Sequence, residues 1–139
     1  MNQAADLSWL VGKCVVDVEH NDHSWIFRFS GGGVVCTESD WRLVSSEAIR
    51  VTAQDEGQRF GLGQPVDARA RVLELTVGKG LVGFRIGDRT GDLSLEFEDS
   101  GLLEFVNLSS GYESWRAQFG SNEIICLGGG QVVRHPVNS

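Results

Sequence analysis

Apolar and polar side chains alternate along much of this chain with the period of two that β-strands show. Two stretches, "WIFRFS" at 25–30 and "LSLEFE" at 93–98, place an apolar residue at every second position. These apolar positions are Trp25, Phe27, Phe29, Leu93, Leu95 and Phe97. We therefore expect two strands that bury these side chains and expose Arg28, Glu96 and Glu98.

The two stretches belong to an internal repeat. "VGKCVVDVEHND" at 11–22 aligns with "VGKGLVGFRIGD" at 77–88, and 25–35 then aligns with 93–103 after a two-residue shift. Six additional residues around 108–113 precede the next match, which is between "WR" at 41–42 and "WR" at 115–116. Further along, Ile49 falls on Ile124. Because the length differences occur where turns are expected, the pattern predicts an internal duplication.

Alternation also predicts which face each copy buries. In the first copy Val16 and Val18 point toward the core, and His20 follows them on the same face. The aligned positions of the second copy are Val82, Phe84 and Ile86. We therefore expect the same face to be buried in both copies.

A helix is expected before each copy. The segment "VDARARVLEL" has Val66, Ala70, Leu73 and Val77 at helical spacing, and Leu7 and Leu10 occupy the matching place at the N-terminus. The sequence thus predicts a mostly β, α+β fold: an internally duplicated antiparallel meander, either a sandwich or an open barrel, with one short helix per repeat. The predicted organisation is a single domain over 1–139, with repeat 1 at about 7–52, a loop at 53–65, repeat 2 at about 66–127 and a C-terminal strand at 131–137.

Composition narrows the classes of function. The chain has 139 residues, 18 glycines against 2 prolines, 3 cysteines and a net charge of −7. The acidic balance argues against nucleic acid as a partner, and no apolar run approaches the roughly 20 residues of a membrane span. An N-terminus without a basic and an apolar region, together with few and scattered cysteines, favours a cytoplasmic protein.

Residues with reactive side chains form no recognisable catalytic or metal-binding motif. His20, Asp22 and His23 lie within four positions, yet His20 aligns with Ile86 on the core face, and Asp22 and His23 fall in the following turn, so a hairpin is favoured over a metal site. The cysteines, Cys14, Cys36 and Cys126, align with Gly80, Glu104 and Val51 and lack zinc-ligand spacing. The glycine triplets at 31–33 and 128–130 lack the Gly-Lys-Ser/Thr of a phosphate loop. We expect no catalytic residue, no metal and no cofactor.

Two loops are the candidate partner-binding segments. Arg59 and Phe60 lie between glycines in the loop that joins the repeats, and Tyr112 and Glu113 lie in the six additional residues of the second copy. Tyr, Phe and Arg are enriched at the centres of protein interfaces. The competing interpretation is that Phe60 and Tyr112 cover the ends of the core. Weaker candidates are the repeated pairs Trp41, Arg42, Trp115 and Arg116, which also suit an architectural role.

Several blocks in order resemble a small bacterial domain family that is common in actinobacteria: "ESDWRL", "GQRFGLGQPVDARA", "TGDLSLEF", "LEFVNLSSGYESW" and the terminal "GGG". The resemblance runs from about Leu10 to Gly130. It implies no activity, cofactor or catalytic residue. By general type, a small acidic β-rich protein is also similar to the immunity proteins that neutralise bacterial toxins.

Three hypotheses of function follow. The first is a non-enzymatic cytoplasmic protein-binding domain, either an immunity-like inhibitor of a basic toxin or a protein that binds a second copy of itself. The second is a small-molecule-binding protein with a pocket between the repeats, walled by Trp25, Trp41 or Trp115. The third is an enzyme whose site assembles from residues far apart in the sequence.

Overall fold

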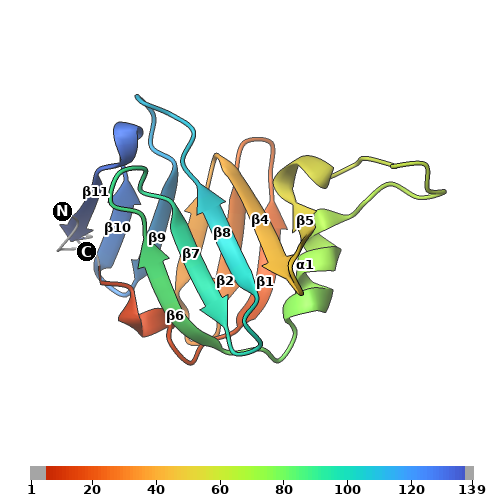
Figure 1. The fold of residues 1–139 in the computed structure, drawn as a ribbon. Helices are drawn as coiled ribbons and strands as arrows, with labels where there is room; N and C mark the ends of the chain where they lie inside the picture. Colours follow the sequence, from red (N-terminus) through yellow and green to blue (C-terminus); the bar gives the residue numbers. More distant parts are fainter. Residues whose placement is uncertain (1–5, 137–139) are drawn as a thin grey trace.

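The computed structural model describes residues 6–136, and within them the chain forms eleven strands in two open antiparallel sheets (Figure 1). The six-stranded sheet has the order β1 (Val15–His20), β2 (Trp25–Phe29), β3 (Val34–Thr37), β9 (Trp115–Phe119), β10 (Asn122–Cys126) and β11 (Val132–Pro136). The five-stranded sheet has the order β5 (Ala48–Thr52), β4 (Asp40–Ser45), β8 (Leu102–Val106), β7 (Leu93–Phe97) and β6 (Leu81–Ile86). The mostly β, α+β fold is confirmed, and it is a sandwich rather than a closed barrel. The predicted C-terminal strand extended to position 137, which lies outside the described residues.

The strand order repeats between the two halves of the chain. The first copy contributes β1, β2 and β3 to one sheet and β4 and β5 to the other, while the second copy contributes β6, β7 and β8 to the latter and β9 and β10 to the former. Consequently β3 pairs with β9 and β4 pairs with β8, so each sheet contains strands of both copies. The two copies are therefore interlocked through these two pairings.

The core lies between the sheets and contains the alternating residues that the sequence predicted. Trp25, Phe27, Phe29, Leu93, Leu95 and Phe97 are all buried. Arg28, Glu96 and Glu98 are exposed, as expected. Edge-to-face contacts join the two layers: the ring centroids of Phe27 and Trp41 are 5.3 Å apart, and those of Phe27 and Phe105 are 5.2 Å apart. Aromatic pairs prefer this geometry.

One prediction about facing is wrong in both copies. Val16 is 55% exposed and Val82 is 52% exposed, although alternation placed both toward the core. The cause is a β-bulge: the pairing of β1 with β2 shifts between Val15 and Asp17, and the pairing of β6 with β7 shifts at the equivalent place. A bulge adds one residue to a strand and reverses the alternation beyond it. The same irregularity thus occurs at equivalent places in both halves of the chain.

The alignment of the last strands also needs correction. Ile49 is 57% exposed whereas Ile124, on which it was aligned, is 3% exposed. The strand pairing makes Val51, and not Ile49, the equivalent of Ile124. Val51 lies opposite Leu43, two residues after Trp41, and Ile124 lies opposite Ala117, two residues after Trp115. A third bulge, in the β4–β5 pair between Leu43 and Val44, accounts for the shift.

The helix of each copy covers an edge of the sandwich. The first is the three-residue 3₁₀ helix η1 (Ser8–Leu10), which contacts β6, and the second is α1 (Ala68–Thr76), which packs on β1 and β5. The buried side chains of α1 are Ala68, Val72 and Thr76. The helical face predicted through Val66, Ala70, Leu73 and Val77 is therefore displaced, and Val77 is 73% exposed. The helix begins later than predicted because Asp67 caps it, accepting a hydrogen bond from the Ala70 amide at 3.0 Å.

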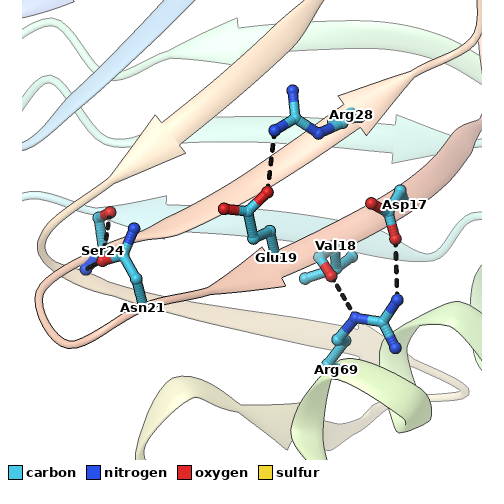
Figure 2. A network of polar contacts seen from close by, with 7 residues as sticks. All are labelled: Asp17, Val18, Glu19, Asn21, Ser24, Arg28 and Arg69. Carbon is cyan, nitrogen blue, oxygen red and sulfur yellow. Dashed lines mark hydrogen bonds and ion pairs between the residues drawn. The ribbon is translucent and has the colours of Figure 1, made fainter.

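Helix α1 also protects the edge of the six-stranded sheet. Figure 2 shows Arg69 of this helix reaching β1, where its Nε donates a hydrogen bond to the Val18 carbonyl and its Nη2 contacts Asp17 Oδ1 at 3.0 Å. On the face of the same sheet, Arg28 forms an ion pair with Glu19 at 2.9 Å. Unpaired edge carbonyls invite pairing with other chains, and a covering helix prevents this.

None of the helices in the described part of the chain combines the length and the apolar character needed to cross a membrane.

Candidate functional site

The connections between strands gather at one end of the sandwich, which we call the loop end. It comprises the β1–β2 connection at 21–24, the β3–β4 connection at 38–39, the 3₁₀ helix η2 (Ala53–Asp55) and the β8–β9 connection at 107–114. The last of these contains the six additional residues of the second copy and projects beyond the strands (Figure 1). Residues far apart in the sequence thus share one surface.

The projecting β8–β9 connection is fixed at its base. Asn107 donates its amide N–H to Asp92 Oδ1 at 2.8 Å and its side-chain nitrogen to the Thr90 carbonyl at 2.8 Å. The Ser109 hydroxyl accepts a hydrogen bond from the Tyr112 amide at 2.8 Å, which holds the turn at the tip. Tyr112 itself is 82% exposed. An ordered loop therefore presents this aromatic side chain to solvent, and Tyr112 does not cover the core.

A hollow of about 400 Å³ lies beside this connection. Its lining includes His20, Asp22, His23, Trp25, Glu38, Ser39, Asp40, Ala53, Gln54 and Leu108. His20 is exposed and its ring stacks on Trp25 with 3.8 Å between centroids, so the prediction that His20 faces the core is wrong. Among residues 6–136, no group of three or more His, Cys, Asp or Glu side chains has an arrangement that could hold a metal ion.

The two copies differ in the length and packing of the loops at this end. In the second copy the β6–β7 connection is two residues longer and packs tightly on the segment after β10: a Cβ at Gly91 would lie 2.7 Å from the Gly130 carbonyl oxygen. The Gly91 carbonyl accepts a hydrogen bond from Trp115 Nε1 at 2.8 Å. In the first copy, the equivalent Trp41 Nε1 is buried without a hydrogen-bond partner in the described structure.

A second, smaller pocket of about 260 Å³ adjoins the hollow on the outer face of the six-stranded sheet. Its lining comprises Ser24, Ile26, Cys36, Thr37, Glu38, Glu113, Ser114, Trp115 and Arg116. Glu38 lines both cavities. Together the two linings contain four carboxylates, Asp22, Glu38, Asp40 and Glu113, against one guanidinium, Arg116.

The repeated Trp-Arg pairs have mainly architectural positions. Trp41 and Trp115 are each 1% exposed. Arg42 forms an ion pair with Glu104 across the strands at 2.7 Å, and Arg116 forms one with Glu113 at 2.9 Å. Of these four weaker candidates, Trp115 and Arg116 line the smaller pocket.

The other candidate segment lies apart from the loop end. Residues 57–66, which we call the finger, extend away from the sandwich beyond α1 (Figure 1). Backbone hydrogen bonds from Gly57 to Val66 and from Val66 to Gln58, at 2.9 and 2.8 Å, close its base. Phe60 is 67% exposed, so it does not plug the core. The structure therefore does not bring Arg59 and Phe60 together with Tyr112 and Glu113.

The tip of the finger is a tight turn. The Leu62 amide donates to the Arg59 carbonyl at 2.7 Å, and the central residues Phe60 and Gly61 have φ angles of +48° and +78°. Positive φ at both central positions is the signature of a type I′ turn, which favours Asn-Gly. Arg59 Nη1 also donates to the Gly63 carbonyl at 2.9 Å.

Within residues 6–136 the three cysteines are free thiols, of which Cys126 is buried and Cys14 and Cys36 are half-buried. Burial raises the pKa of the Cys126 thiol to about 11, and Asp92 adds to this effect. Burial likewise raises the pKa of Cys36, against an opposing effect of Arg116 and Arg28. Both thiols are therefore disfavoured as nucleophiles at neutral pH, because the thiolate is the reactive form.

Sequence reasoning missed Glu38 and Ser114. They come from connections of different copies and meet only because β3 pairs with β9. One sequence signal could have pointed to the pocket. Cys36 aligns with Glu104, so the first copy lacks the acid that the second copy has at the equivalent strand position.

No family model matches the chain, and neither the curated proteins nor the solved structures contain a similar protein. The resemblance to an actinobacterial domain family therefore stays a prediction, and the site has to be interpreted from its geometry.

Proposed function

We propose that this chain is a non-enzymatic protein-binding domain, that the loop end is its partner surface, and that the partner presents a basic surface. The observation that carries the proposal is the excess of carboxylates at this end. Asp22 and Glu38 have no ion-pair or hydrogen-bond partner for their side chains within residues 6–136, so they are available to an incoming cation. Complementary charge accelerates association and selects among partners.

The exposed apolar side chains of the same surface support the proposal. Tyr112 and Leu108 are 82% and 68% exposed on a connection whose base is fixed by hydrogen bonds. Large side chains on an ordered loop lose little conformational entropy when a partner covers them. A central aromatic anchor with charged groups around it is a frequent arrangement in protein interfaces.

A small-molecule pocket walled by Trp25, Trp41 or Trp115 receives less support, because Trp25 and Trp115 each line one cavity of the loop end whereas Trp41 lines neither. Trp41 and Trp115, two of its three suggested walls, are each 1% exposed, and Trp41 contacts Trp25 and Phe27 edge to face. Side chains of both sheets thus fill this part of the interior. Within the binding class, an acidic inhibitor of a basic toxin, acting in the cytoplasm as an immunity protein does, is the role that we propose.

Selection from a random 12-residue peptide library tests the charge of the partner. We expect the wild-type protein to select peptides rich in Lys and Arg, and the double variant Asp22→Asn/Glu38→Gln to lose them. The matched control is Glu96→Gln/Glu98→Gln, which removes the same charge from exposed positions on β7 and just after it. Selection of neutral or acidic peptides, or equal loss in both variants, would contradict the proposal.

The immunity role needs a separate test. If a toxin gene lies beside the gene for this chain, co-expression is expected to restore growth of cells that make the toxin. The variant Tyr112→Ser is expected to weaken this protection while leaving thermal stability nearly unchanged, because Tyr112 is exposed. Equal killing with and without this protein would dismiss the immunity role but not peptide binding as such.

A further inference from the structure

The duplication provides an internal comparison for the smaller pocket. In the five-stranded sheet, Arg42 of β4 lies directly opposite Glu104 of β8, and the two form an ion pair at 2.7 Å. The equivalent pair in the six-stranded sheet is Arg116 of β9 opposite Cys36 of β3. Both copies therefore have the arginine, but the first copy has the small, weakly polar Cys36 at the position where the second copy has Glu104, so Arg116 lacks a cross-strand acid.

The smaller pocket lies at this position of the six-stranded sheet. Without a carboxylate opposite, Arg116 instead pairs with Glu113 at 2.9 Å and lies 3.9 Å from Glu123. The floor between the strands is left to Ile26 and Cys36, which are both half-buried. The rim is formed by Glu38 on one side and by the ion pair on the other.

Ser114 supplies an unused hydrogen-bonding group at this site. Its residue is 5% exposed, it lines the pocket, and its buried hydroxyl has no partner in the described structure. The backbone around the hydroxyl is fixed, because the Ser114 carbonyl accepts from Thr37 Oγ1 at 3.1 Å and the Ser114 amide donates to the Cys126 carbonyl at 3.0 Å. A buried polar group without a partner is costly, which favours a ligand that satisfies it.

Resting on the proposed function, we infer that this pocket takes one basic side chain of the partner, an arginine or a lysine, as an anchor. Its aliphatic part packs on Ile26 and Cys36, and its cationic group lies at the carboxylate of Glu38. The hydroxyl of Ser114, which is buried in the free protein, joins this contact when its side chain turns into the pocket. Long basic side chains bury their methylene groups in this way while keeping the charge at the rim. The carboxylate of Glu38 has no ion-pair partner within residues 6–136.

Size and charge exclude other occupants. The volume of about 260 Å³ lies below the roughly 300–1,000 Å³ of small-molecule sites and suits a single side chain. An anionic group would meet Glu38 and Glu113 at the rim, and the one guanidinium there is already paired. The pocket therefore selects a cation.

Short blocked peptides test the inference by NMR. The probes are acetyl-Gly-Arg-Gly-amide and acetyl-Gly-Lys-Gly-amide, with the neutral analogue acetyl-Gly-citrulline-Gly-amide as a control of the same shape as arginine. We expect the two basic peptides to shift the amide signals of Cys36, Glu38 and Ser114 at low salt with millimolar affinity. The citrulline peptide is expected to bind less tightly. Equal binding of arginine and citrulline would overturn the inference.

Three variants locate the site. Glu38→Gln is expected to weaken binding of the arginine peptide about twofold to fivefold, which is the effect of losing an exposed ion pair. Glu98→Gln removes the same charge from an exposed position after β7 and is expected to have no effect. Ser114→Ala is expected to weaken binding while leaving the urea midpoint unchanged or higher, because the hydroxyl has no partner to lose. A lower midpoint with unchanged affinity would assign Ser114 a structural role and contradict the inference.

The outcomes separate this inference from the proposed function. If the library selects basic peptides but neither Glu38→Gln nor Ser114→Ala alters their affinity, the loop end binds basic partners without this anchor. If signals of Asp22 and His23 shift instead of those of Cys36 and Ser114, the cation lies in the larger hollow and the inference is wrong. If no basic peptide is selected or bound, both proposals fail.

Discussion

Equivalent residues of the two copies have different hydrogen bonds, and this difference is most direct for the two buried tryptophans. Trp41 and Trp115 begin the same part of each repeat and are equally buried. Only Trp115 has a partner for its indole N–H, the Gly91 carbonyl at 2.8 Å. The chain thus contains a matched pair in which the same side chain occurs with and without a buried hydrogen bond.

Replacing each tryptophan by phenylalanine should measure that bond. Both substitutions remove the same atoms from a buried site, but Trp115→Phe also leaves the Gly91 carbonyl without its donor. We expect Trp115→Phe to lower the free energy of unfolding by about 1–2 kcal/mol more than Trp41→Phe does. Urea unfolding of the two variants measures the difference. Equal losses would mean that the bond to Gly91 adds no net stability.

Among the strands and loops, alternation predicted buried faces well only where pairing is regular. Strands β2 and β7 follow the period of two. The pairing of β2 with β3 and that of β7 with β8 have no register shift. Val16 and Val82 were wrongly predicted to face the core. The amino-acid sequence does not mark a bulge, because a bulge depends on how the neighbouring strand pairs. The same applies to Ile49, which is displaced by the bulge between β4 and β5.

In the candidate site, too, residues were predictable where the signal is local in the sequence and not where it depends on strand pairing. Tyr112 and Glu113 could be recognised because they have no counterpart in the first copy, and an insertion on a regular scaffold is visible by alignment alone. Glu38 and Ser114 could not, since their proximity results from the pairing of β3 with β9. The two candidate loops, the finger and the β8–β9 connection, lie apart in the fold (Figure 1).

The finger carries a local conflict that can be tested. Phe60 adopts a left-handed backbone, with φ of +48°, at the turn position where asparagine is favoured. Because it is 67% exposed, it gains little by burial in return. We expect Phe60→Asn to raise the free energy of unfolding by about 0.5–1 kcal/mol through relief of this strain.

The control for this prediction is Leu62→Asn, because Leu62 is 63% exposed on the same turn and has no positive φ. It is expected to leave stability unchanged within about 0.5 kcal/mol. Equal gains from both variants would attribute the effect to surface polarity rather than backbone strain. If a partner also binds the finger, Phe60→Asn weakens that binding while stabilising the free protein.

At the scale of the whole molecule, the decisive feature is that the two copies exchange strands. Each sheet depends on the β3–β9 or β4–β8 pairing between copies, and the finger contributes no strand to either sheet. The finger is also the covalent connection between the copies, and it contains Arg59, a trypsin cleavage site, in an exposed tight turn. Exposed loop tips are the preferred sites of proteolytic cleavage.

We therefore expect limited trypsin digestion to cut first after Arg59 and to produce two fragments that stay associated. The cut protein should elute from a sizing column like the intact chain and keep its β-sheet circular dichroism, because all interstrand hydrogen bonds remain. Separated in urea and diluted alone, each fragment should be unfolded or self-associated, since it lacks the partners of its third and fourth strands. Mixing the fragments in equal amounts should restore the native spectrum. A single fragment that is monomeric and unfolds cooperatively would show that one copy folds alone, and the interlocked account of stability would then be wrong.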